Sequence, residues 1–220
     1  ALAALADADD DIARQFRAAY EALVTREALP ALAAWLREGG ADVDAESCGA
    51  RFYFQAVPCV RVQQPCRWHT LRPHFDRMYG HDARTLNFYV PLSARTFDSC
   101  ALQLESAAGA EDFAPLALRF GQMAAFHAAE LAHMTVANET DCTRVTLDFR
   151  VVWARLHEPP PVASSAAGGA ARPVGRYEVG GYYSVAELGA AGHFQVVERG
   201  EPSEQHGFPF GARGGAPSKG

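Results

Sequence analysis

The sequence predicts a mainly β protein with flanking helices, built on an antiparallel sandwich or barrel. From Ala50 onward the apolar pattern changes from a helical period to strict alternation, and no helical crossover separates the alternating segments. The chain has 220 residues, of which 49% are hydrophobic and 21% are charged, and these values fit a globular protein with a substantial core. The expected strands are 51–55, 59–63, 86–92, 101–105, 123–127 and 143–153.

Two helices are expected before the strands. Between residues 9 and 25, apolar side chains that include Tyr20 recur on one stripe, after an acidic first turn. Pro30 suits the first turn of a second helix, and the Gly39-Gly40 pair suits its end. Residues 1–49 are therefore expected to form a helical scaffold packed outside the sheet.

The composition divides the rest of the chain into a core and three further segments. Residues 50–157 hold the expected strands and form the core. Residues 158–176 contain a run of prolines and a Ser/Ala/Gly stretch, which favour a flexible loop. Residues 177–206 are expected to complete or cover the core, and residues 207–220 to be a disordered tail.

Charge, hydropathy and cysteine content exclude several classes of protein. A net charge of −6 argues against nucleic-acid and anionic membrane partners. No apolar run reaches the roughly 20 residues that span a bilayer, and no intact signal peptide is recognisable. The expected location is therefore cytoplasmic, or unknown if a leader has been removed. Five cysteines without Cys-x-x-Cys spacing fit neither a disulfide framework nor a zinc site. We expect them to be mostly reduced, although Cys59 and Cys66 would pair in an oxidising compartment.

One His-x-Asp pair follows the second expected strand. His74 and Asp76 lie two residues apart, so an extended chain directs both side chains to the same face. An imidazole and a carboxylate side by side supply two of the three protein ligands of a mononuclear iron site. Chance alone gives about one such pair in a chain of this composition, so its meaning depends on the rest of the sequence.

The strand expected at 143–153 separates into an apolar face and a polar face. Charged side chains on a strand that otherwise resembles a core strand need partners, water or a ligand. His133 lies 11 residues before Arg144, with turn-forming residues between them. We expect the two on neighbouring strands of a hairpin that face one cavity, which makes His133 the candidate third metal ligand. The polar face consists of Arg144, Thr146, Asp148 and Arg150.

The ordered set of a His-x-Asp pair, a distal histidine and an arginine with a Ser/Thr partner resembles the iron(II)- and 2-oxoglutarate-dependent oxygenases. The residues in and around these motifs are similar to those of the streptomycin-biosynthesis oxygenase-like branch, over roughly residues 50 to 155. The resemblance is carried by Arg72-Pro-His-Phe-Asp-Arg-Met-Tyr-Gly-His, Leu86-Asn-Phe-Tyr-Val-Pro-Leu, Leu102-Gln-Leu-Glu-Ser, Gly109-Ala-Glu-Asp-Phe and Thr143-Arg-Val-Thr-Leu-Asp-Phe-Arg-Val.

The resemblance implies a double-stranded β-helix (jelly-roll) core with iron(II) held by the His-Asp-His set. It implies that Arg144 binds the distal carboxylate of 2-oxoglutarate with its planar fork, and that Thr146 adds a hydroxyl donor. Asn87 alternates away from its apolar neighbours and would face the same cosubstrate. No catalytic residue beyond the metal ligands is implied.

Four further residues are candidates for contact with a small-molecule substrate. Arg61 and Gln63 alternate with valines, so their face borders either the cavity or solvent. His81 precedes an aspartate on the opposite face, which makes it a poor metal ligand and a better candidate for a substrate contact. Glu105 points either into the barrel or into a structural ion pair.

The activity implied by the resemblance is oxidation, most often hydroxylation, of a C–H bond in a small molecule, with succinate and carbon dioxide as coproducts. One alternative is a non-oxidative, cupin-like isomerase or lyase that uses the same metal. Arg144 and Thr146 argue against it, because a lyase needs no carboxylate clamp. The other alternative is an inactive jelly-roll binding module, which has no need to keep a complete ligand set.

Overall fold

The computed structural model describes residues 11–44, 50–156 and 177–201, so the predicted loop at 158–176 and the predicted tail at 207–220 lie outside the described residues. The chain divides into two compact units, here called the helical unit and the sheet unit. The helical unit comprises Ala1–Arg51, Gln55–Val57 and Pro159–Gly220, and the sheet unit comprises Phe52–Phe54 and Pro58–Glu158.

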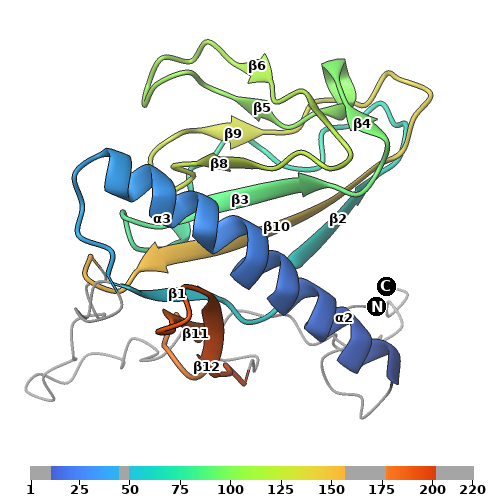
Figure 1. Cartoon of the computed structure of the whole chain (residues 1–220). Coiled ribbons are helices and arrows are strands. Elements are labelled where there is room, and N and C mark those ends of the chain that lie inside the picture. The colour runs from blue at the N-terminus through green and yellow to red at the C-terminus, as the bar shows by residue number, and fades with distance from the viewer. Residues whose placement is uncertain (1–10, 45–49, 157–176, 202–220) are drawn as a thin grey trace, which may run out of the picture. The chain divides into compact units, whose positions relative to one another are not determined.

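The helical unit contains one continuous run of helix where two separate helices were expected (Figure 1). The run comprises α2 (Asp11–Leu23), the π-helical turn η1 (Val24–Ala28) and α3 (Leu29–Glu38). The N–H of Leu29 bonds to the carbonyl of Val24, five residues back, just before Pro30, which has no N–H to donate. The wider turn therefore carries the helix past the proline. No helix in the described ranges is long and apolar enough to cross a membrane.

The helical run ends where the sequence predicts, at the Gly39-Gly40 pair. Gly39 caps α3, and Gly40 follows with a φ of 83°, a value that favours glycine. After the second gap the chain forms an antiparallel hairpin of β11 (Tyr183–Leu188) and β12 (Phe194–Glu198). Arg199 Nε and Nη2 bond to the two carboxylate oxygens of Glu21 at 2.7 and 2.8 Å, which ties the end of this hairpin to α2.

The larger sheet of the sheet unit is antiparallel throughout. Its neighbouring strands are, in spatial order, β1, β10, β3 and β8, and β2 also pairs with β10 (Figure 1). The bounds are β1 (Arg51–Gln55), β2 (Cys59–Gln63), β3 (Leu86–Pro91), β8 (Ala124–Phe126) and β10 (Arg144–Trp153). Each strand falls within a segment that the alternating pattern predicts.

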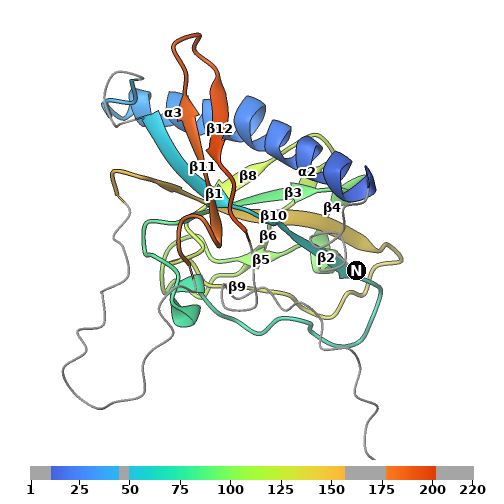
Figure 2. The ribbon, with the colours of Figure 1, turned by 90° about the horizontal axis from the view of Figure 1, so that it is seen from below.

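A smaller antiparallel sheet lies to one side of the larger one (Figures 1 and 2). Its order is β6, β5, β9, and an isolated bridge between His74 and His133 adds a further extended segment beside β9. A separate pair, β4 with β7, completes the strands of this unit. The bounds are β4 (Arg95–Thr96), β5 (Gln103–Leu104), β6 (Ala114–Pro115), β7 (Leu118–Arg119) and β9 (His133–Met134).

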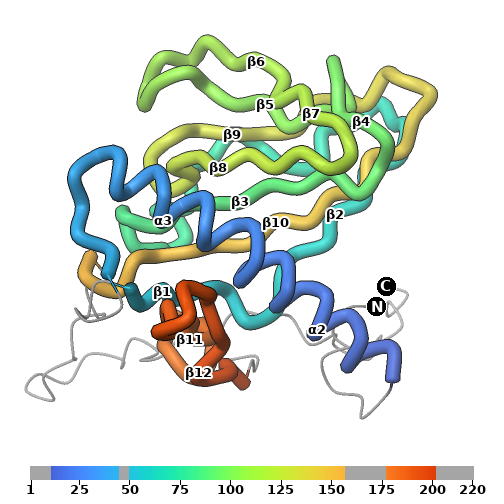
Figure 3. The backbone as a smooth tube through the Cα atoms, viewed as in Figure 1, coloured from blue at the N-terminus to red at the C-terminus, as the bar shows by residue number. Residues whose placement is uncertain are grey.

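The chain winds back and forth between these two sheets (Figure 3). It passes from β2 to the His74 segment, back to β3, across to β5 and β6, back to β8, across to β9 and back to β10. This winding is that of a double-stranded β-helix, and it confirms the predicted fold class. Packed between the sheets is an apolar cluster of Tyr89, Leu102, Phe126 and Ala128.

Strand β10 shows the two faces that its sequence predicts. The apolar face is buried at Leu147, Phe149 and Val151, and Phe149 stacks on Phe88 with 5.3 Å between ring centroids. The polar face is buried as well, and its side chains point between the sheets. A buried row of charged groups on a central strand must be compensated by partners or ligands, so this row is the first place to look for a ligand site.

Candidate metal centre

Two histidines are brought together by the backbone. His74 and His133 form an antiparallel bridge in which each backbone N–H bonds to the other residue's carbonyl, with N–O distances of 3.2 and 2.9 Å. Their ring centroids lie 4.3 Å apart. Nδ1 of His74 lies 2.8 Å from the carbonyl of Arg72, and Nδ1 of His133 lies 3.0 Å from that of Leu131. Because a carbonyl only accepts, each Nδ1 carries the proton, which leaves each Nε2 lone pair available for a metal.

Asp76 reaches the same point from the opposite end of a short extended segment. Phe75 is extended, with φ −119° and ψ 148°, so the side chains of His74 and Asp76 leave the chain on the same side, as predicted. Asp76 then begins the 3-10 turn η3 (Asp76–Tyr79), and its own N–H bonds to the carbonyl of Ala128 at 2.7 Å. Asp76 Oδ1 lies 3.6 Å from Nε2 of His133 and 3.9 Å from Nε2 of His74.

These three side chains fit a metal ion. One ligand atom from each lies within 4.8 Å of the other two, all three residues are buried, and they are the one such group in the ranges that the structure describes. Two imidazoles and one carboxylate, with the remaining positions open, form the donor set of the facial triad that holds iron(II). The predicted ligand set of His74, Asp76 and His133 is thus assembled in one place.

Arg150 completes the environment of Asp76. Its Nε and Nη2 lie 2.8 and 2.7 Å from Oδ2 of Asp76, so the guanidinium occupies one carboxylate oxygen while Oδ1 faces the histidines. Burial raises the pKa of Asp76, but Arg150, His81 and His133 together lower it by more than burial raises it. The pKa therefore lies below its ordinary value of 3.8, and the group is anionic. Burial lowers the pKa of His133 and keeps it neutral. Metal ligation requires these protonation states.

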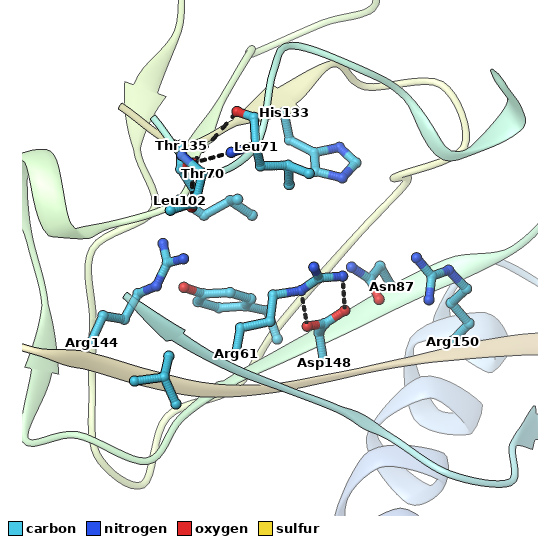
Figure 4. Close-up of a pocket in the computed structure, with 12 residues that line it drawn as sticks. Arg61, Thr70, Leu71, Asn87, Leu102, His133, Thr135, Arg144, Asp148 and Arg150 are labelled. Carbon is cyan, nitrogen blue, oxygen red and sulfur yellow. Dashed lines mark hydrogen bonds and ion pairs between the residues drawn. The ribbon is translucent and has the colours of Figure 1, made fainter. Parts of the chain in front are cut away.

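A cavity of about 240 Å³ opens between the two sheets beside this centre (Figure 4). Its walls come from β2, β3 and β10 on one side and from residues 70–71, 102 and 133–135 on the other. Figure 4 shows Arg144 and Arg150 at opposite ends of the β10 wall, with the Arg61–Asp148 pair between them. The charged or polar residues that line the cavity are Arg61, Thr70, Asn87, Tyr89, His133, Thr135, Arg144, Asp148 and Arg150.

Arg144 is the charged residue of this wall without a counterion. It is 2% exposed, it makes no ion pair within the described residues, and its one hydrogen bond is from Nη1 to the carbonyl of Cys100 at 3.3 Å. Its Nε and the Oδ1 of Asn87 are buried without a hydrogen-bond partner in the described structure. Burial raises the pKa of Tyr89, and Arg144 and Thr146 beside it lower it. A buried guanidinium with unsatisfied donors favours the binding of an anionic ligand.

His133 and Arg144 face the same cavity, but the prediction that they lie on neighbouring strands is wrong. His133 lies on β9, which pairs with β5 in the smaller sheet, and Arg144 begins β10 in the larger sheet. The polar segment between them crosses from one sheet to the other instead of forming a hairpin. The two residues therefore approach the cavity from opposite walls.

The remaining candidates occupy different surroundings. Arg61 lines the cavity and is paired with Asp148. The amide nitrogen of Gln63 bonds to the carbonyl of Val136 at 2.8 Å. His81 is buried close enough to Asp76 to lower its pKa. Glu105 accepts the N–H of Ala132 at 2.6 Å, next to His133, and is not among the residues that line the cavity.

Several residues that line the site were not singled out from the sequence, among them Arg150, Asp148 and Tyr89. Arg150 and Asp148 belong to the polar face of β10, and their alternation with Arg144 was the available signal. Tyr89 stands two residues after Asn87 on β3, so the same alternation places it on the cavity side. The alternation gives the face of each side chain but not its partner on another strand.

The chain is similar in sequence to a protein of antibiotic biosynthesis. Over 107 residues the chain is 31% identical to the streptomycin biosynthesis protein StrG of Streptomyces griseus, to which it is distantly related. The match covers 49% of this chain and 50% of that protein, so the chain spans about half the length of this curated relative. No family model matches.

Solved structures with similar folds share little sequence with this chain. The epimerase SnoN from nogalamycin biosynthesis is 16% identical, with a TM-score of 0.38, over 55% of this chain and 58% of that one. A nickel complex of the non-heme monooxygenase ThoJ is 18% identical, with a TM-score of 0.36, over 49% and 46%. A cupin domain from an Enterobacter cloacae transcriptional regulator is 12% identical, with a TM-score of 0.29, over 44% and 79%. The topology and the site's own residues show a chain with a double-stranded β-helix fold and a buried His-Asp-His group that could hold a metal ion.

Proposed function

We propose that this protein is an iron(II)- and 2-oxoglutarate-dependent oxygenase that oxidises a C–H bond of a small molecule. The observation that carries the proposal is a pairing within one cavity. His133, one member of the His-Asp-His triad, lines this cavity, and the buried, uncompensated guanidinium of Arg144 lines it from the opposite wall. A 2-oxoacid with a second carboxylate satisfies both, because its oxoacid end chelates a metal and its distal carboxylate suits an arginine fork.

The surrounding residues are suited to hold such a cosubstrate. Arg144 supplies charge and donors to the distal carboxylate, and Asn87 lines the cavity with an unsatisfied amide oxygen. Thr146 is not among the residues that line the cavity, but its hydroxyl lies on the same face of β10, buried without a hydrogen-bond partner in the described ranges, and would add a further donor. The iron site would supply the activation of dioxygen, and the cavity walls would exclude water from the oxidant. In the overall reaction, substrate, 2-oxoglutarate and dioxygen give hydroxylated substrate, succinate and carbon dioxide.

The function is tested by anaerobic titration of the iron-loaded protein with 2-oxoglutarate, followed by admission of oxygen. We expect a visible absorption band on binding and succinate on oxygenation. Binding of iron without 2-oxoglutarate would contradict the proposal and would favour the non-oxidative, cupin-like metalloenzyme. Absence of binding of either would favour an inactive jelly-roll module.

Arg144→Lys should weaken 2-oxoglutarate binding by roughly 1.5–3 kcal/mol, the range for a hydrogen bond to a charged group, because lysine keeps the charge but loses the planar fork. The measurement is the dissociation constant from the same titration. Arg119→Lys, a change at an exposed arginine outside the cavity, is the matched control and should leave binding unchanged. Equal affinities for the wild type and Arg144→Lys would remove Arg144 from the cosubstrate site.

A further inference from the structure

An anionic ligand that reaches from the metal centre to Arg144 would lie alongside a carboxylate in the cavity wall. Along β10, Arg144, Thr146, Asp148 and Arg150 share one face, and consecutive members are separated by about 6.6 Å. At one end, Arg144 and Thr146 form the proposed site for the distal carboxylate. At the other end, Arg150 is paired with the proposed metal ligand Asp76. Asp148 lies between these two ends and lines the cavity.

Asp148 is paired with an arginine from the neighbouring strand. Arg61 of β2 approaches it with two parallel contacts, Nε to Oδ1 at 2.6 Å and Nη2 to Oδ2 at 3.2 Å. The side chain of Asp148 is 3% exposed and that of Arg61 is 39% exposed. A deeply buried carboxylate thus depends on a guanidinium that is in partial contact with solvent.

The other groups around this carboxylate do not replace Arg61. Tyr89 is the cross-strand partner of Asp148 on β3, and its pKa is raised by burial, so it stays neutral. Cys59 is the cross-strand partner on β2. Arg150, the next cation along the wall, is engaged with Asp76. Arg61 is therefore the residue whose charge offsets that of Asp148.

We propose that Arg61 is a positioning residue for anion binding: by neutralising Asp148, it makes the cavity acceptable to a dicarboxylate. The proposal rests on the proposed function. Without Arg61, the charge of Asp148 would face a dianion at close range in a medium of low dielectric constant, and repulsion of this kind lowers affinity by roughly tenfold or more. The pair thus sets how strongly the cavity discriminates between dianionic and monoanionic oxoacids.

The test uses Arg61→Met, Asp148→Asn and the double variant, each loaded with iron(II) without oxygen and titrated with 2-oxoglutarate. We expect Arg61→Met to bind at least about tenfold more weakly, because Asp148 is left unpaired. Asp148→Asn should bind as tightly as the wild type or more tightly, because Arg61 is released toward the anion. The double variant should return to within about threefold of the wild type, because both charges are gone.

A second oxoacid separates an electrostatic role from a structural one. 2-Oxobutyrate has the same chelating end as 2-oxoglutarate but lacks the distal carboxylate, so Arg61→Met should weaken its binding less than it weakens 2-oxoglutarate binding. If the Arg61–Asp148 pair were purely structural, its loss would weaken the binding of both oxoacids equally. Binding would then be weakened in Asp148→Asn as well. Either of those results overturns the inference.

The double variant also guards against a folding defect, since it lacks the unpaired buried charge that would destabilise Arg61→Met. Should Arg61→Met fail to fold, weak 2-oxoglutarate binding by a folded double variant, together with weak binding by Asp148→Asn, would still refute the proposal. Failure of the wild type to bind 2-oxoglutarate would remove the proposed function and this inference together. Normal binding by the wild type and by Arg61→Met would remove the inference alone.

Discussion

Replacing any one of His74, Asp76 or His133 with alanine is expected to lower iron occupancy and turnover by at least about tenfold, because loss even of a group that orients a metal ligand costs 10–100-fold. Each of these residues contributes one ligand atom, and the three ligand atoms lie within 4.8 Å of one another. No other such group exists among the described residues. Iron binding should be measured by equilibrium dialysis of the anaerobic protein, with oxygen uptake as the second readout.

His127→Ala is the matched control, because His127 is exposed and precedes the Ala128 carbonyl that bonds to Asp76. This variant should bind iron as the wild type does. His81→Ala is the more demanding comparison, since His81 is buried and lowers the pKa of Asp76. If the three triad variants kept wild-type iron binding while His81→Ala lost it, the ligand set would have to be reassigned.

Arg150→Met is expected to destabilise the metal-free protein by about 3–5 kcal/mol, the usual cost of removing one partner from a buried ion pair. Asp76 and Arg150 have side chains that are 3% and 9% exposed, so Asp76 would keep its charge with little solvent to compensate it. The measurement is urea unfolding of the metal-free variant at pH 7. Asp76→Asn/Arg150→Met should regain part of the loss.

The pH dependence of that stability should reverse in sign. In the wild type the pKa of Asp76 is below 3.8, so the carboxylate stabilises the fold above this value and the contribution is lost as the pH falls further. In Arg150→Met the effect of burial prevails and raises the pKa, so stability should improve as acid protonates Asp76. Arg77→Met, which removes a 2.8 Å ion pair with the partly exposed Glu130, is the control and should cost less than about 1 kcal/mol. A stability loss equal to that of this control would show that Arg150 does not compensate Asp76.

The features that the sequence predicts best depend on local periodicity. Alternation separates the side chains of β10 into two faces, whatever strand lies beside it, and it puts Arg144 and Asp148 on the same face, which lines the cavity in the structure. The extended residue between His74 and Asp76 likewise brings both to one side. Such relations involve neighbours in sequence, so no knowledge of the tertiary fold is needed.

The features that the sequence did not predict involve partners far apart in the chain. His133 was expected beside Arg144, but β9 pairs with β5 in the smaller sheet, and the chain crosses to the larger sheet between His133 and Arg144. The contact between Arg150 and Asp76 joins residues 74 positions apart, and alternation carries no information about it. Short strands such as β9 also have too few residues to show a period.

The helical region illustrates a different limit. A proline in a helical pattern usually marks a boundary, and this rule predicted two helices separated before Pro30. The structure keeps the helix continuous by inserting a π turn that removes the need for the missing N–H. Which of the two solutions occurs is decided by packing: Val24, Ala28 and Leu29 are fully buried at this turn, and a break would expose them.

The backbone bridge between His74 and His133 means that two of the three ligands are joined before any ion arrives. Folding has already brought the two ends of the long intervening segment together. The entropy cost of closing this segment therefore does not weaken metal binding. In zinc fingers, by contrast, the metal itself organises an unfolded chain. Here the ion meets a scaffold that is already assembled, so loading and unloading can proceed as a local exchange at the cavity while the rest of the protein stays folded.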